Sequence, residues 1–184
     1  YCSAPGDATR IKAQSTLYEI LQALLKLLAP ILAFTAEEAW QFLPGDKEES
    51  VHLARFPEPV EEYDNDELSG RWDTLLRVRE QVLKQLELAR ERKEIGNSLE
   101  AHVTLTAAGA LFELLHSYAA ALPDMLIVSC VDLVRGEETA EAATVSTTIK
   151  RTEGAKCQRC WKILPDVGQH DHPGVCGRCD AALG

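Results

Sequence analysis

Two pairs of closely spaced cysteines near the C-terminus are the residues of this sequence best suited to chemistry. Cys157 and Cys160 form the first pair, Cys176 and Cys179 form the second, and fifteen residues separate the pairs. A Cys-x2-Cys turn presents two thiolates to one metal ion, and a second such turn completes a tetrahedral shell of four sulfur atoms. The spacing therefore predicts one structural zinc ion with these four cysteines as its ligands. A closed shell has no open position for a substrate, so we expect the metal to fold the segment and not to catalyse a reaction.

Three roles are open for this cysteine-rich segment. A redox-active Cys-x2-Cys pair is one, although two pairs at this spacing favour a metal. A second is a purely structural clip for the C-terminal part of the chain. In the third, the metal holds basic and aromatic side chains against a nucleic acid. Trp161 follows the second cysteine, in a knuckle too small to bury an indole, where it could stack on an unpaired base. Arg159, Lys162 and Arg178 could then contact the flanking phosphates.

The charge of the chain limits how a nucleic acid could bind. The 184 residues carry a net charge of −10, which argues against a protein coated in nucleic acid. The balance is uneven, however: from Lys150 onward the local charge is +2, which leaves −12 for residues 1–149. We therefore expect a polyanionic partner to be contacted at one place, the C-terminal segment.

Other features of the sequence indicate a reducing compartment and no catalytic centre. No signal sequence opens the chain and no uninterrupted apolar run is long enough for a membrane, so we expect reduced thiols in the cytoplasm and no membrane partner. Cys130 lies in an apolar run and is expected to be buried. His170 and His172 are expected to be exposed loop residues and not ligands. There is no Gly-rich phosphate loop, nucleophile elbow or His-Glu-x-x-His motif, and hence no candidate catalytic residue. The chain begins at Tyr1 without a methionine, from which we expect a piece of a longer protein.

Two helices are predicted before residue 45. Apolar residues recur every three or four positions over residues 9–29, the spacing of one helical face, and we expect this stripe to lie in the core of a helix bundle. Its members are Ile11, Leu17, Leu21, Leu24 and Leu28. Pro30 is expected to end or kink this helix. Thr35 and Glu38 match a capping box and predict that the second helix begins at Thr35.

The middle of the chain predicts a long helix followed by a small α/β unit. Helical periodicity runs from about residue 66 to 94, with Gly96-Asn97 as its stop. Alternating, helical and apolar patterns then follow in turn. They predict a strand at 101–106, a helix at 111–122 and a strand at 125–133. Residues 136–144 are acidic and unpatterned, as in a linker, and alternation resumes at Val145.

These elements predict a mainly α-helical fold with a small α/β junction, followed by a C-terminal four-cysteine zinc ribbon. We expect three parts: a helical domain segment at 1–65, the long helix with the α/β junction at 66–136, and a zinc-binding module at 145–184.

Two stretches of the sequence resemble a known family. The run Arg10-x3-Gln14-x2-Leu17-Tyr18, continued by Leu27 to Trp40, resembles the anticodon-binding helical domain of class I aminoacyl-tRNA synthetases for Ile, Val, Leu and Met. The stretches Lys156 to Trp161 and Val175 to Cys179 are similar to the C-terminal zinc module of bacterial isoleucyl-tRNA synthetases.

This resemblance implies the C-terminal part of an ATP-dependent ligase that attaches isoleucine to its tRNA. The partners implied are the anticodon stem and loop of the isoleucine tRNA and the upstream domains of the same chain, which alone would bind ATP; we expect a monomer. Carried over to this sequence, the four cysteines are zinc ligands, and Trp161 and Arg159 are anticodon contacts. The alternative is a stand-alone zinc-ribbon module that binds nucleic acid without ligase activity, and a third reading is a scaffold that zinc merely clips. The motif around Leu28-Ala29-Pro30 disfavours both, because neither requires it.

Overall fold

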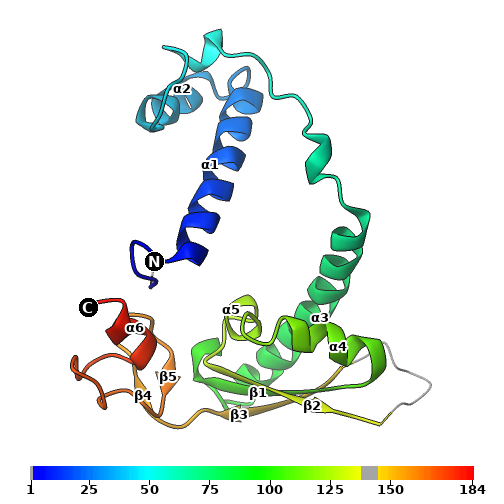
Figure 1. Ribbon diagram of the computed structural model, residues 1–184. Helices are drawn as coiled ribbons and strands as arrows, with labels where there is room; N and C mark the ends of the chain where they lie inside the picture. The colour runs from blue at the N-terminus through cyan, green and yellow to red at the C-terminus, as the bar shows by residue number, and fades with distance from the viewer. Residues whose placement is uncertain (1, 138–144) are drawn as a thin grey trace. The chain divides into compact units, whose positions relative to one another are not determined.

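A computed structural model describes residues 2–137 and 145–184, and these form two compact units (Figure 1). Residues 3–64 make up one unit, and residues 65–184 together with Cys2 make up the other. The linker expected at 136–144 lies outside the described residues except for its first two positions. The expected division into three parts stays a prediction.

Unit 3–64 is built on two helices. Helix α1 spans Ala8–Leu28, and its first turn is capped by the Asp7 carboxylate, which accepts a hydrogen bond of 2.9 Å from the backbone N–H of Arg10. Helix α2 spans Ala33–Phe42. The first helix is thus confirmed to within one residue at each end, but the capping box predicted at Thr35 is wrong. The backbone N–H of Leu32 still bonds to Leu28, so the chain re-enters a helix before it reaches Thr35.

The core of this unit forms around Trp40, whose indole N–H donates to the carbonyl of Glu48 at 2.8 Å. Around it lie Leu25, Ala29, Ala36, Leu43 and Val51, the last in a short 3-10 helix, Val51–Leu53; a second such helix spans Glu61–Tyr63. The stripe of α1 expected in the core is exposed in this unit: Ile11, Leu17, Leu21, Leu24 and Leu28 all keep more than a third of their surface. That prediction is wrong for the described residues, because α2 covers one side of α1, the side that carries Leu25.

The second unit contains a three-stranded sheet with helices on one face (Figure 1). Strand β1 (Ala101–Ala107) is central; β2 (Cys130–Arg135) pairs with it in parallel and β3 (Ser146–Arg151) antiparallel. Helix α3 spans Asp66–Glu91, and a 3-10 turn at Ser98–Glu100 leads into β1. Helices α4 (Gly109–Ser117) and α5 (Leu122–Met125) connect β1 to β2. Alternate residues of β1 are buried, which confirms the predicted half-buried strand.

Two element ends differ from the prediction for the same reason. α3 stops at Glu91, before Gly96, because Lys93 adopts a left-handed conformation (φ 60°) and the N–H of Glu94 bonds back to Ala89. This is a Schellman motif, which usually carries glycine at the position of Lys93. α5 ends in the same motif at Ile127 (φ 57°), so β2 begins at Cys130 instead of residue 125.

Cys130 is half-buried and not buried as expected, because β2 is an edge strand of the sheet. Its sulfur accepts a hydrogen bond of 3.7 Å from the Thr152 hydroxyl.

The zinc module begins with a short antiparallel ribbon of β4 (Ala155–Lys156) and β5 (Ile163–Leu164) and ends in α6 (Gly177–Ala181). The cysteines form its centre with Val175. The predicted fold class, mainly helical with a small α/β junction and a zinc ribbon, is confirmed. Among the described residues, no helix is both long and apolar enough to cross a bilayer.

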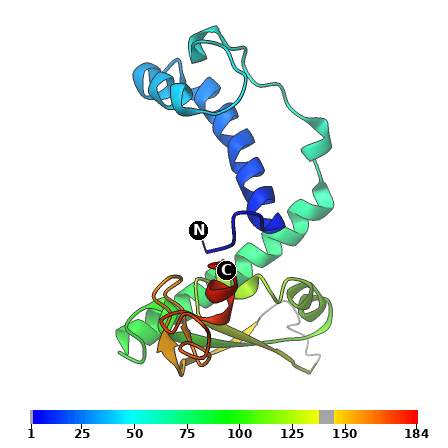
Figure 2. The ribbon, with the colours of Figure 1, turned by 60° about the vertical axis from the view of Figure 1, so that its left-hand side comes forward.

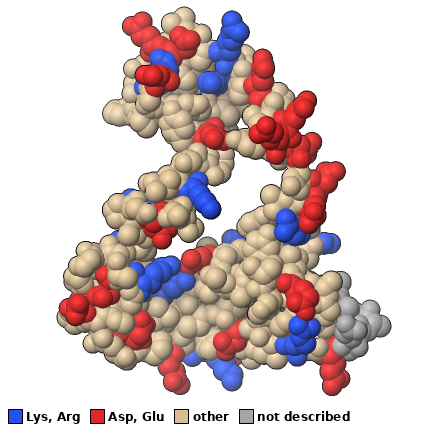
Figure 3. Space-filling model, viewed as in Figure 1, with Lys and Arg blue, Asp and Glu red and all other residues tan. Residues whose placement is uncertain are grey.

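Acidic and basic side chains are interspersed over the face shown in Figure 3. Figure 2 gives a second view of the same elements.

Candidate metal centre and nucleic-acid interface

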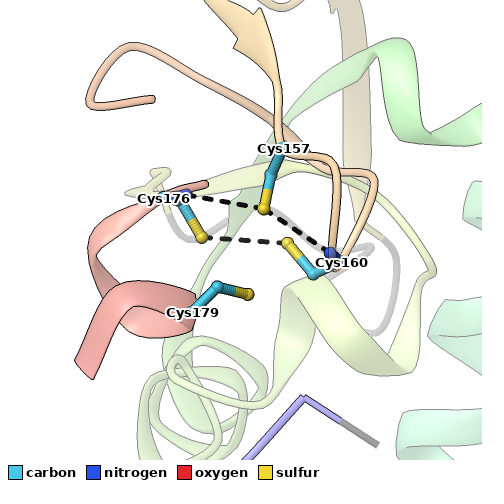
Figure 4. Close-up of side chains that lie close together, drawn as sticks. All are labelled: Cys157, Cys160, Cys176 and Cys179. Carbon is cyan, nitrogen blue, oxygen red and sulfur yellow. Dashed lines mark hydrogen bonds between the residues drawn. The ribbon is translucent and has the colours of Figure 1, made fainter. Parts of the chain in front are cut away.

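The four cysteine side chains of the zinc module point toward one another (Figure 4). Their sulfur atoms all lie within 4.8 Å of each other, and those of Cys160 and Cys176 are 3.8 Å apart. Cys157 and Cys160 belong to the turn between β4 and β5, Cys176 caps α6, and Cys179 lies within that helix. A tetrahedron of Zn–S bonds of about 2.3 Å separates its sulfur atoms by about 3.8 Å, so this arrangement fits a zinc ion.

The electrostatics of the cluster favour one thiolate and disfavour two others. Burial opposes ionisation of Cys157, but its sulfur accepts hydrogen bonds from the backbone N–H groups of Cys160 (3.5 Å) and Cys176 (3.4 Å). These bonds outweigh burial and lower the pKa of Cys157 to about 6. Burial raises the pKa of Cys176, and raises that of Cys179 to about 12. A bound cation offsets this penalty, because a thiol that coordinates a metal ion is deprotonated and releases its proton to the solvent.

Two aspartates hold the loops that carry the second cysteine pair. Asp166 accepts hydrogen bonds from the Gly177 backbone (2.7 Å) and pairs with His170 (3.0 Å). The Gly177 N–H and then His170 lower the pKa of this carboxyl. Asp180 accepts from the backbone N–H of His172 (2.9 Å) and pairs with its ring (2.8 Å). Both histidines, expected to be exposed, are thus partly buried and paired, and they stand outside the thiol cluster.

Trp161 projects from the knuckle with 60% of its surface exposed. Its backbone is left-handed (φ 66°) and its N–H bonds to the carbonyl of Cys157 at 2.9 Å. The ammonium group of Lys156 lies 5.4 Å from the centre of the indole ring. The knuckle therefore presents an aromatic face together with a cation, the combination that binds stacked bases beside a phosphate.

The three basic residues expected near Trp161 have protein partners. Arg159 donates to the carbonyl of Cys2 at 2.6 Å, and its guanidinium also lowers the pKa of Cys179 against the larger effect of burial. Lys162 and Arg178 converge on Asp124 of α5, at 2.6 Å and 3.6 Å. The Lys162 side chain is only 14% exposed, whereas that of Arg178 is 48% exposed. The Asp124 carboxylate thus links Lys162 to Arg178.

Sequence reasoning missed Asp124 and Lys156. No sequence signal identifies Asp124, because 37 residues separate it from Lys162 and the pairing depends on how the chain folds back. Lys156 could have been found, since it directly precedes the first cysteine of the turn that also carries Trp161.

Comparison with known families identifies the helical part of the chain. Residues 1–105 match the family described as the anticodon-binding domain of tRNA ligase. The chain belongs to this anticodon-binding family. Residues 154–182 match a second family, the zinc finger found in FPG and IleRS. That match and the converging thiols together indicate a structural zinc ion in this member of the family.

Curated relatives of this family member are isoleucine–tRNA ligases. Those of Syntrophotalea carbinolica and Fervidobacterium nodosum are 42% and 45% identical to it over 191 and 186 residues, and that of Carboxydothermus hydrogenoformans is 44% identical over 187 residues. Each alignment covers the whole chain, which spans about a fifth of the length of these relatives. The resemblance to isoleucyl-tRNA synthetases expected from the sequence is confirmed.

Proposed function

We propose that this chain is the tRNA-recognition part of an isoleucine–tRNA ligase and that it binds the anticodon stem and loop of the isoleucine tRNA. The observation that carries the proposal is the pairing of an anticodon-binding match at 1–105 with the zinc-finger match at 154–182 in a chain aligned along its full length with isoleucine–tRNA ligases. ATP-dependent attachment of isoleucine belongs to the other domains of such a ligase. We further propose that the protein acts as a cytoplasmic monomer.

In this proposal Cys157, Cys160, Cys176 and Cys179 are the ligands of one zinc ion. The metal supplies structure: it ties the β4–β5 turn to α6, and this tie fixes the backbone on which Trp161 stands. The buried cluster of the module consists of Cys157, Cys176, Cys179 and Val175. Since so short a segment cannot build a larger apolar core, the metal takes the place of that core.

Trp161 is proposed to stack on an unpaired base of the anticodon loop. Its exposure and the nearby ammonium of Lys156 support this role, since stacked bases carry phosphates at their flanks. Arg159 holds the knuckle through Cys2, and Lys162 and Arg178 add positive charge beside it. A local positive site on a chain of net charge −10 directs the RNA to one place.

The alternative function, a stand-alone zinc ribbon, accounts for residues 154–182 only. It leaves the anticodon-binding match over residues 1–105 and the alignment of the whole chain without a role.

A binding experiment tests the proposal. The zinc-loaded chain is titrated into labelled isoleucine tRNA and, separately, into valine tRNA, and fluorescence anisotropy gives both affinities. We expect tighter binding of the isoleucine tRNA, and a loss of about fivefold to a hundredfold for Trp161→Ala, the range of one stacked base. Trp161→Phe is the matched control, because it keeps a ring that can stack. Equal affinities for the two tRNAs, unchanged in Trp161→Ala, would contradict the proposal.

A cellular experiment tests the link to the ligase reaction. Removing the codons for residues 154–182 from the chromosomal gene should lower the charged fraction of isoleucine tRNA while that of valine tRNA stays constant. Charging levels on acid gels measure both. Normal isoleucine charging in the truncated strain would separate this chain from the ligase function.

A further inference from the structure

The zinc module is bonded to the α/β part of its own unit along a defined seam, formed by residues 124–129 on one side and 161–163 on the other. Lys162 pairs with Asp124, and the backbone N–H of Ile163 donates to the Ser129 hydroxyl at 2.7 Å. That hydroxyl is buried and donates in turn to the carbonyl of Leu99 at 2.6 Å. Figures 1 and 2 show the module beside α5 and the start of β2. These bonds tie the position of the knuckle to the sheet.

Two large apolar side chains flank this seam and remain exposed. Trp161 directly precedes Lys162, and Ile127 lies between Asp124 and Ser129. Their exposed fractions are 60% and 54%. Both residues therefore adjoin the bonds of the seam, Trp161 from the zinc module and Ile127 from the connection between α5 and β2.

Both residues also adopt a backbone conformation that disfavours them. Ile127 has φ 57° and Trp161 has φ 66°, in the left-handed region where glycine is usual. Ile127 is the more costly, because it is β-branched and fills the glycine position of the Schellman motif that ends α5. Such outliers cluster at binding sites, where the side chain is retained for what it contacts.

We propose that Ile127 and Trp161 form one composite base-binding surface across the seam, with Asp124 as its positioning residue. The occupant is the unpaired bases of an RNA loop, so the inference rests on the proposed anticodon binding. Trp161 stacks on one base, and Ile127 packs against the apolar face of the next base or its sugar. Asp124 neutralises one of its two cations, so the trio with Lys162 and Arg178 keeps one net positive charge for the adjoining phosphate.

The first test is Ile127→Gly. This variant separates binding from folding, because it should lower the RNA affinity without lowering the stability of the protein. Glycine relieves the left-handed backbone, so the thermal unfolding midpoint should stay constant or rise. The affinity for the anticodon stem-loop RNA should nevertheless fall by about threefold to tenfold, because an apolar contact is lost. Val134→Thr is the control, at a similarly exposed β-branched residue at the far end of β2. Unchanged affinity in Ile127→Gly would overturn the composite surface.

The second test concerns Asp124. If Asp124 positions the surface, Asp124→Asn should weaken RNA binding with unchanged zinc content, Asp124→Glu should restore it in part, and Trp161→Ala should cost less in the Asp124→Asn background than alone. A carboxylate without a positioning role would only repel RNA, so its removal would tighten binding, and that result would overturn the assignment. Glu113→Gln, which removes a similar exposed ion pair to Arg135, is the control.

The Trp161→Ala and Ile127→Gly variants together distinguish failure of the composite surface from failure of the proposed anticodon binding. If Trp161→Ala loses affinity while Ile127→Gly does not, the composite surface falls and tRNA binding by the zinc module stands. If neither variant loses affinity, the role of the knuckle in anticodon binding falls as well.

Discussion

The α/β part and the zinc module lie in one unit, yet each is stabilised internally by a different interaction. In the α/β part, side chains from α3, β1, α4 and the α5 turn form an apolar core, including the fully buried Leu75, Leu86, Leu105 and Leu115. In the zinc module the buried cluster consists of Cys157, Cys176, Cys179 and Val175. The first core is stabilised by removing apolar surface from water, whereas the second depends on a metal to join its sulfur atoms. The stability of this unit is therefore divided between a part that needs zinc and a part that does not.

Zinc removal should have the largest effect, and it should be confined to the zinc module. A chelator, or Cys176→Ser, should unfold residues 155–182, since structural zinc contributes about 10–16 kcal/mol of apparent binding energy in segments of this size. Hydrogen exchange read by mass spectrometry should show loss of protection in the module and retained protection in β1. Simultaneous loss of protection in β1 would mean that the two cores are not independent.

The reverse perturbation is Leu86→Ala in the α/β core. Leu86 is fully buried on α3, so the cavity should cost about 2–5 kcal/mol of unfolding free energy. The zinc content, measured by atomic absorption, should not change. Leu88→Ala is the control on the same helix, where exposure limits the expected cost to about 0.5 kcal/mol. Equal costs at both positions would contradict the assigned core.

Acidification should weaken zinc binding, and it should therefore destabilise the zinc module more than the α/β core. The raised pKa values of Cys176 and Cys179 mean that these thiols are protonated near neutral pH without metal, so zinc binding must release their protons. Zinc affinity should then fall by at least about a hundredfold for each unit of pH lost, because these two protons alone contribute a factor of about ten each. Calorimetric titrations in buffers of different ionisation enthalpy count the protons. Zinc binding without proton release would refute the assigned ionisation states.

The smallest expected effect concerns the C-terminal end of α3. Lys93 fills a left-handed position at the end of α3, so Lys93→Gly should raise the stability of that part by about 0.5–1 kcal/mol. Arg92→Gly is the matched control, because Arg92 is right-handed and gains nothing from glycine. Chemical denaturation measures both, and destabilisation of Lys93→Gly would argue against the capping motif.

Sequence patterns predicted where the helices and strands lie better than they predicted which residues are buried. The stripes of α1 and α3 have the same periodicity, but Leu75, Val78, Val82 and Leu86 are buried whereas Leu17, Leu21 and Leu24 are exposed. Periodicity reports that a helix has an apolar face, not whether the described residues cover it. Helix ends were missed at Lys93 and Ile127, because neither residue type marks a left-handed position.

The candidate site was predictable where it depends on local spacing. The cysteine turns bring the sulfurs together over short loops, and the exposure of Trp161 follows from the small size of the knuckle. Asp124 was not predictable, because it pairs with Lys162 through tertiary folding of a distant segment. Local chemistry thus indicated the metal centre, and only the fold revealed the ion pairs of Asp124 beside it.

The most direct test of the account follows the indole N–H signals of Trp40, Trp72 and Trp161 by NMR during titration with the anticodon stem-loop of isoleucine tRNA. Trp40 is buried and Trp72 packs against Tyr118, so each serves as an internal reference. We expect a saturable shift of the Trp161 signal in the zinc-loaded protein, and loss of this shift after chelation. A Trp161 signal that stays constant while the RNA binds would contradict the claim that zinc presents this residue to the anticodon loop.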